Sequence, residues 1–182
     1  DINRERNKQI ILQANELNNV LLANNIRPIF LKGTGNLLAG LYKDIAERMV
    51  GDIDFIFSKE DYPKAVIVLT KNGYSFVEKI PYDLHSMHYP RLKKEDRIAG
   101  IEIHHEIILR KYSKEFNYSF IEKDSQVIKG VAVLSYSNKL CLSIISDQII
   151  DNGFFYKTMA LRNAYDVFLL SKKTSAKAAV NT

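Results

Sequence analysis

Two spacings of apolar residues alternate along this chain, one typical of helices and one typical of strands. In residues 3–24, Ile10, Ala14, Leu17 and Leu21 recur every three or four positions, which predicts an amphipathic helix. Similar patterns predict further helices at 34–42, 59–72, 137–150 and 154–171. Short apolar or alternating runs predict strands at 28–33, 48–58, 74–80, 86–92, 97–109 and 125–136, and the last also fits a hairpin around Gly130.

Local signals indicate where several of these elements begin and end. Thr34 and Ser58 are hydroxyl residues at the starts of two predicted helices, where their side chains can cap free backbone N–H groups. Pro63 falls near the first turn of the helix at 59–72, and Gly73 ends it.

The order of the elements predicts an α/β (α+β) fold with a small mixed sheet flanked by helices. We expect an α/β core over residues 1–135, which includes the N-terminal helix 3–24. A C-terminal helical region over 136–172 and a flexible tail over 173–182 would follow it.

Composition narrows the class of protein. The chain has 182 residues, of which 46% are apolar, enough for one ordinary domain or for one domain with a helical appendage. No apolar run approaches the ~20 residues that span a bilayer, and no signal-peptide pattern is visible. Cys141 is the only cysteine, which excludes an intrachain disulfide and argues against a cysteine-based zinc site. We therefore expect a cytoplasmic protein that does not enter a membrane.

The net charge of +5 favours an anionic ligand such as a nucleotide, a nucleic acid or phosphate. The basic residues are scattered, and the densest runs, "RLKKEDR" and "SKKTSAKAA", are short. A solvated basic surface is therefore favoured over a dedicated nucleic-acid interface.

The segment "VGDIDFIF" places two acidic residues inside an apolar strand. Asp52 and Asp54 are two positions apart, so they point to one face while Ile53 and Phe55 point to the core. Burying two neighbouring carboxylates unpaired is costly. A divalent cation such as Mg²⁺ or Mn²⁺ would compensate. Pairing with Arg48 or with lysines at an exposed strand end would do so as well.

Two other segments add candidate chemistry around this pair. In "FLKGTGNLL" a glycine turn joins a strand to a helix, and Lys32 lies at the strand end, an arrangement that can hold phosphate. In "GIEIHHEI", Glu102, His104 and Glu106 share one strand face, and a third carboxylate suits a two-metal phosphoryl-transfer site. A plain strand–helix turn and a half-exposed edge strand are the corresponding structural alternatives.

Two further sets of residues have a structural and a functional interpretation. His85 and His88 have a spacing that binds metal on a helix, but flanking prolines favour a loop or a strand. Arg162 and Asp166 can form an ion pair across one helical turn; alternatively, Arg162 or Lys157 contacts a nucleotide.

Together the segments "LKGTGNLL", "ERMVGDIDFIF", "GY", "IEIHHEI" and "LRNAYDVFLLS" resemble the uncharacterised bacterial nucleotidyltransferase-like family, within the superfamily typified by DNA polymerase beta. The resemblance covers about residues 10 to 170 and implies the roles of eight residues. Asp52, Asp54 and Glu102 would bind metal and act in catalysis. Gly33 and Thr34 would begin the phosphate-contacting turn. Lys32 and Arg48 would bind the triphosphate or order the site, and His104 would line it. This chain departs from the superfamily pattern because Thr34 replaces a serine and Glu102 replaces the more usual aspartate.

The resemblance implies an enzyme that uses Mg²⁺ or Mn²⁺ to transfer a nucleoside monophosphate from a nucleoside triphosphate to a hydroxyl. The acceptor could be a small molecule, a protein side chain or an RNA end. The alternatives are an inert nucleotidyltransferase-fold module that binds a nucleotide or a partner protein, a toxin-type component of a defence pair, and a "DxD" glycosyltransferase. The acceptor, the base preference and the oligomeric state are not predicted.

Overall fold

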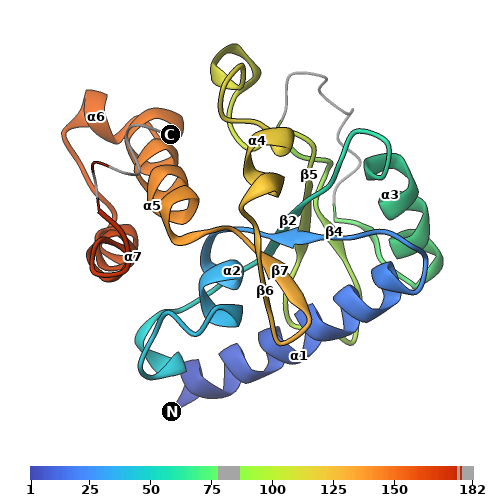
Figure 1. Cartoon of the computed structure of the whole chain (residues 1–182). Coiled ribbons are helices and arrows are strands. Elements are labelled where there is room, and N and C mark those ends of the chain that lie inside the picture. The colour runs from blue at the N-terminus through green and yellow to red at the C-terminus, as the bar shows by residue number, and fades with distance from the viewer. Residues whose placement is uncertain (78–86, 176, 178–182) are drawn as a thin grey trace.

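The computed structural model describes residues 1–77, 87–175 and 177 and contains one mixed, seven-stranded sheet (Figure 1). The strand order is β3-β4-β5-β2-β1-β7-β6. The pairs β1–β7 and β2–β5 are parallel, and the other neighbouring strands are antiparallel. The strands are β1 (Ile29–Phe30), β2 (Ile53–Ile56), β3 (Ser75–Phe76), β4 (Leu92–Lys93), β5 (Ile101–His104), β6 (Gln126–Ile128) and β7 (Val131–Val133).

Helices cover the sheet and extend beyond one side of it. In Figure 1, α5, α6 and α7 gather on the side opposite α3. The α-helices are α1 (Ile2–Leu22), α2 (Lys32–Leu38), α3 (Tyr62–Lys71), α4 (Tyr118–Lys123), α5 (Tyr136–Ile145), α6 (Gly153–Tyr156) and α7 (Leu161–Ser171). Short 3₁₀ turns lie at Ile45–Glu47 and Arg110–Tyr112, and a π-helical turn, Ser146–Ile150, continues α5.

Alternation along β2 divides its side chains between two apolar clusters. Ile53 and Phe55 are fully buried in a cluster that includes Ile10 and Leu21 of α1. Ile56 is buried on the opposite side of the strand, in a second cluster. Asp54 shares the face of Ile56, because successive strand residues point to opposite faces. The alternation predicted for this strand is therefore confirmed.

The predicted hairpin around Gly130 is also confirmed. Strands β6 and β7 pair antiparallel, with Ile128 opposite Val131. Lys129 and Gly130 form the two-residue connection, and both have positive φ angles, +51° and +82°. A two-residue hairpin loop with two positive φ angles has the backbone twist that suits the flanking strands.

Several predicted boundaries are wrong. The helix predicted at 154–171 is two helices, because Lys157 at the end of α6 adopts a φ of +53° and ends the helix. Helix α2 begins at Lys32, two residues earlier than predicted, so Thr34 does not cap it; the cap position is Leu31. Ser58 does accept a hydrogen bond from the Asp61 N–H, 3.1 Å away, just before α3. Helix α4 follows an Asn117 cap and was not predicted.

The described strands are shorter than the sequence pattern suggests. Residue 86 lies outside the described residues; of residues 87–92, only Leu92 belongs to a strand, and His88 makes an isolated bridge to His104. His85, part of the segment 74–80 and most of the predicted tail lie outside the described residues. The division into a core and a helical region at residue 135 stays a prediction. Among the described residues, none of the helices combines the length and apolarity needed to cross a membrane.

Candidate active site

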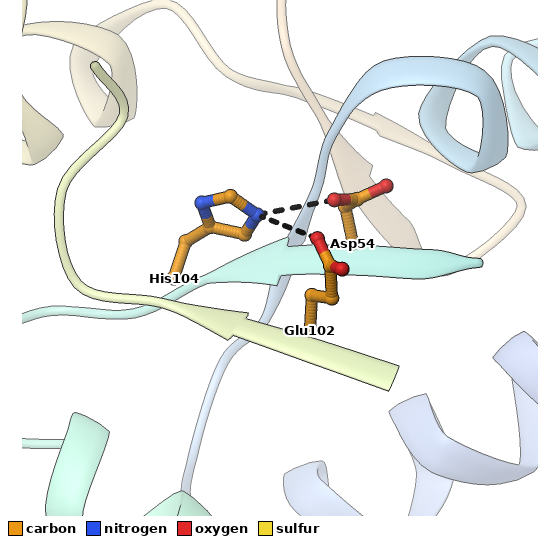
Figure 2. Close-up of side chains that lie close together, drawn as sticks. All are labelled: Asp54, Glu102 and His104. Atoms are coloured by element: carbon orange, nitrogen blue, oxygen red, sulfur yellow. Dashed lines mark hydrogen bonds and ion pairs between the residues drawn. The ribbon is translucent and has the colours of Figure 1, made fainter. Parts of the chain in front are cut away.

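The acidic residues are brought together by the register of the sheet. In the parallel pair β2–β5, Asp54 lies directly beside Glu102 and Ile56 beside His104. On the other side of β2, the Leu31 N–H donates to the Asp54 carbonyl at 2.9 Å, which places the start of α2 next to the acids. Figure 2 shows the Asp54, Glu102 and His104 side chains converging from the two strands.

Lys32 is the closest cation to this group. Its Nζ lies 2.6 Å from Asp54 Oδ1, 3.5 Å from His104 Nε2 and 3.8 Å from Glu102 Oε2. Lys32 has a φ of +47°, a backbone conformation that residues other than glycine rarely adopt. Burial lowers the pKa of Lys32, but Asp54 and Glu102 outweigh this effect and raise it, so the ammonium stays charged.

Asp54 is buried and ionised. Burial alone would raise the pKa of its carboxyl, but the Lys32 charge and the hydrogen bond from His104 lower it well below its usual range. The His104 Nε2 is 3.1 Å from Asp54 Oδ1 (Figure 2). Burial is the main cause that lowers the pKa of His104, which keeps the ring neutral near pH 7. A neutral ring can donate Nε2–H to this carboxylate.

Asp52 pairs with Arg91, a residue that the sequence analysis did not single out. Arg91 Nη2 lies 2.9 Å from Asp52 Oδ2 and 2.8 Å from Glu102 Oε1. Burial raises the pKa of Asp52, and the Arg91 charge opposes the rise. The sequence hypothesis that Arg48 neutralises the pair is therefore wrong, while the hypothesis that a lysine pairs with it is confirmed for Asp54.

The glycine-rich start of α2 packs tightly beneath the acids. A Cβ on Gly35 would lie 2.6 Å from the Phe30 carbonyl oxygen, so only glycine lets α2 approach β1 this closely. Gly33 packs against Val50, and the Thr34 hydroxyl donates to the Asp52 carbonyl at 2.7 Å. Thr34 thus positions the first aspartate through its side chain. Phosphate binding by Gly33 and Thr34 stays a prediction.

Arg48 connects the segment between α2 and β2 to the last helix. Its Nε and Nη2 donate to Asp166 Oδ2 at 3.2 and 3.1 Å, and the Tyr42 hydroxyl donates to Asp166 Oδ1 at 2.7 Å. The structure describes both Arg162 and Asp166, and Asp166 pairs with Arg48 instead, so the predicted Arg162–Asp166 ion pair is wrong. Arg162 instead lines the same cleft as the acids.

The donor atoms fit a divalent cation. One ligand atom each from Asp54, Glu102 and His104 all lie within 4.8 Å of one another. Two carboxylates and an imidazole suit Mg²⁺ less well than Mn²⁺, which accepts nitrogen more readily. The carboxylate of Asp52 lies at the edge of this group, against Arg91. The predicted ligand set of Asp52, Asp54 and Glu102 stays a prediction, with His104 as a further candidate.

A cleft of about 240 Å³ opens over the acids and extends to the C-terminal helices. Predicted site residues that line it are Lys32, Gly33, Arg48, Asp52, Asp54 and Glu102. Residues of α5 and α7, among them Lys139, Ser143 and Asn163, form the opposite wall. The cleft therefore has an acidic end on the sheet and a helical wall of mixed charge, with Lys139 and Arg162 beside Asp147, Asp151 and Asp166.

Lys139 was also missed by the sequence analysis, because it lies in an apolar helical run. Its side chain is almost fully buried, and Nζ donates to the Gly35 carbonyl at 3.2 Å. In the part of the chain that the structure describes, no carboxylate forms an ion pair with it. Burial lowers the pKa of Lys139 to about 7.

Lys139 should make stability depend on pH. Its pKa in the folded protein, about 7, is below the 10.5 of an exposed lysine, so between these values the unfolded chain binds more protons. Stability should therefore rise with pH across this window, by up to ~1.4 kcal/mol per pH unit. Lys139→Met should remove that slope in urea unfolding at pH 7, 8 and 9. The exposed Lys71→Met variant should keep it, and equal slopes in all three proteins would contradict the prediction.

The fold and the cleft together define a class of protein. A chain of this size with a mixed sheet, one acid just before a strand, a second acid within it and a third on its parallel neighbour has the architecture of nucleotidyltransferases. The model of the uncharacterised nucleotidyltransferase family matches residues 1–181. The chain belongs to that family.

Solved structures confirm the fold. The antibiotic-resistance factor ANT(2'')-Ia in complex with adenylyl-2''-tobramycin superposes with a TM-score of 0.62 at 12% identity, covering 94% of this chain and 92% of that one. An antigenic nucleotidyltransferase-like protein from Paracoccidioides brasiliensis gives 0.55 at 12% identity, covering 96% and 85%. A comparison with curated protein sequences finds no match.

Proposed function

We propose that this protein is a metal-dependent nucleotidyltransferase that transfers a nucleoside monophosphate from a nucleoside triphosphate to a hydroxyl group. The observation that carries the proposal is the convergence of Asp52, Asp54 and Glu102 at one end of a cleft that also contains Lys32 and Lys139. Acids that hold a cation and lysines that bind phosphate are the two parts that phosphoryl transfer requires.

The cleft suits an anion beside Lys139. Lys139 is buried without a carboxylate partner among the described residues, so a phosphate beside it would stabilise its charged form. Lys32, now held by Asp54, could turn toward the same phosphates. A divalent ion bound by the acids would neutralise charge on the reacting phosphate. Arg48 lines the cleft while held by Asp166, so it could order the site or contact the triphosphate.

In the proposed reaction, an acceptor hydroxyl attacks the α-phosphorus and pyrophosphate leaves. The hydroxyl must lose its proton, and Glu102, only slightly exposed and at the edge of the cleft, is our candidate base. His104 orients Asp54 through Nε2. The related fold bound to adenylyl-2''-tobramycin supports a small-molecule hydroxyl as one acceptor class to test.

A thermal-shift panel tests the proposal: ATP, GTP, CTP and UTP, each with Mg²⁺, with Mn²⁺ and with a chelator. At 100 times its dissociation constant a ligand stabilises the folded state by ~2.7 kcal/mol. This corresponds to a rise of about 5–11 °C in Tm for a chain of this size. We expect a metal-dependent rise with at least one triphosphate, and its loss in the Asp52→Asn/Asp54→Asn double variant.

One observation favours a second candidate, an inert nucleotidyltransferase-fold module. Lys32 and Arg91 already neutralise the acids without a metal. The inert module predicts no metal-dependent shift in the panel and no pyrophosphate release with any acceptor.

A further inference from the structure

The acidic residues are held by two side-chain cations at two distinct positions. Lys32 Nζ lies among Asp54, Glu102 and His104, at 2.6 to 3.8 Å from one atom of each. Arg91 Nη2 lies between Asp52 and Glu102, at 2.9 and 2.8 Å. A nitrogen that contacts one oxygen of each of two carboxylates occupies the place where an ion bridging those carboxylates would lie.

We propose that Arg91 takes the place of the second metal ion in this protein. The chain would then bind one divalent ion with the nucleoside triphosphate, on the Asp54 side, while Arg91 stays between Asp52 and Glu102. The inference rests on the proposed function and specifies its metal requirement: one ion per active site where a two-metal mechanism uses two.

The sheet is built to hold Arg91 in this position. Leu92 pairs with Ile101 in the antiparallel β4–β5 ladder, so Arg91 and Glu102 are the next cross-strand neighbours and point to one face. The stem of Arg91 crosses Gly100. A Cβ on Gly100 would lie 2.9 Å from Arg91 Cδ and 3.6 Å from Asp52 Oδ1. The absence of a side chain at residue 100 therefore leaves the space through which Arg91 reaches Asp52.

Lys32 and Arg91 differ in whether a bound triphosphate can draw them away from the acids. Lys32 makes one short contact with a carboxylate and lines the cleft, where a triphosphate would offer it new partners. Arg91 makes short contacts with two carboxylates and is not among the residues that line the described cleft. A triphosphate bound in the cleft can therefore release Lys32 and open the first position, but it has no comparable effect on Arg91. A guanidinium also stays charged at any pH that the protein tolerates.

The test counts bound Mn²⁺ by equilibrium dialysis and by electron paramagnetic resonance of the free ion. Each protein is saturated with the α,β-methylene analogue of the triphosphate that gives the largest thermal shift. We expect one Mn²⁺ per chain in the wild type and two in Arg91→Ala. Gly100→Ala should also gain the second ion, because its methyl group displaces the Arg91 stem without removing a charge. Arg97→Ala, which loses surface pairs with Glu16 and Asp96, is the charge-matched control and should bind one.

The outcomes separate the inference from the proposed function. The inference would be overturned if the wild type binds two Mn²⁺ per chain. It would also be overturned if Arg91→Ala and Gly100→Ala each bind only one. Either result leaves the nucleotidyltransferase proposal standing. No Mn²⁺ with any analogue in the wild type would overturn the proposed function. In that case Arg91→Ala is tested with Mn²⁺ and no nucleotide. If this variant gains no Mn²⁺ site, Arg91 does not occupy a position that a metal ion could take.

Discussion

Replacing Asp54 by asparagine is expected to lower the transfer rate at least about a thousandfold while the chain stays folded. Asp54 belongs to the predicted metal-ligand set with Asp52 and Glu102 and also to the set with Glu102 and His104. Its carboxylate contacts Lys32 and His104. Metal stabilisation of a reacting phosphate contributes several kcal/mol, and about 4 kcal/mol corresponds to three decades in rate. The amide of asparagine is neutral and a weak ligand for a divalent ion, so little of this stabilisation should remain.

The same substitution should also cost stability. The Asp54 carboxylate accepts hydrogen bonds from Lys32 and His104, and losing hydrogen bonds to a charged group typically costs about 1–3 kcal/mol. We expect the lower end of this range, because the Lys32 side chain is 37% exposed and water screens the pair. The pKa of Asp54 is lowered in the folded protein, so this stability is present above pH ~4 and is lost as the pH falls through the folded pKa.

Two measurements check these expectations. Pyrophosphate release, followed with the nucleotide and acceptor that the panels identify, should fall in Asp54→Asn and stay within twofold in Asp61→Asn. The control loses the same charge at a surface pair with Lys64. Urea unfolding at pH 7 and at pH 3 should show a gap between wild type and Asp54→Asn that narrows at the lower pH. Undiminished turnover in a folded Asp54→Asn protein would remove Asp54 from the proposed chemistry.

The acidic strand could be predicted because its pattern is local. Alternation alone puts Ile53 and Phe55 in the core and Asp54 on the other face, and Ile53 and Phe55 are both fully buried. Gly130 between two apolar runs likewise suffices for the hairpin, because a two-residue turn needs positive φ angles. The family follows from several such local segments taken together.

A lysine partner for the acids could be suggested from the sequence, but the Arg91 partner could not, because it depends on register between distant segments. The sequence places Asp52 and Asp54 together as repelling charges, whereas in the fold Lys32 and Arg91 hold them separately. Arg91 belongs to a short basic run that is typical of solvated surface, and only its pairing opposite β5 brings it to Glu102. Strand ends and the break between α6 and α7 also depend on tertiary contacts, such as the hydrogen bond from Ala160 N to Asp147.

Asp166 shows the same limit at the other end of the chain. Spacing of four residues on a helix predicts a pair with Arg162, a contact that is usually worth a few tenths of a kcal/mol. The fold instead buries Asp166 against Arg48 and Tyr42, which are far away in sequence. Burial, and then the neighbouring Asp166 carboxylate, raise the pKa of Tyr42, so its hydroxyl remains a donor. This carboxylate therefore joins α7 to the segment between α2 and β2.

Asp166→Ala is accordingly expected to destabilise the protein by about 3–5 kcal/mol, the usual cost of removing one partner of a buried ion pair. For a chain of this length, that corresponds to a fall of about 6–20 °C in Tm. The loss arises because the Arg48 guanidinium, only 13% exposed, and the Tyr42 hydroxyl would lose their acceptor. Asp166→Asn, which keeps one carbonyl oxygen, should lose less.

Differential scanning calorimetry of the two variants measures this loss, and hydrogen exchange shows where it falls. Tyr165→Phe is the matched control on the same helix, since its hydroxyl donates to the exposed Glu47 at 2.7 Å and its removal should cost less than about 0.5 kcal/mol. Amides of α7 should exchange faster in Asp166→Ala than those of β2 and β5. If Asp166→Ala melts within 2 °C of the wild type, the Arg48–Asp166–Tyr42 network does not hold α7 in place. Other contacts of α7, such as the hydrogen bond from the Asn163 side chain to the Ser143 carbonyl of α5, would then hold the opposite wall of the cleft.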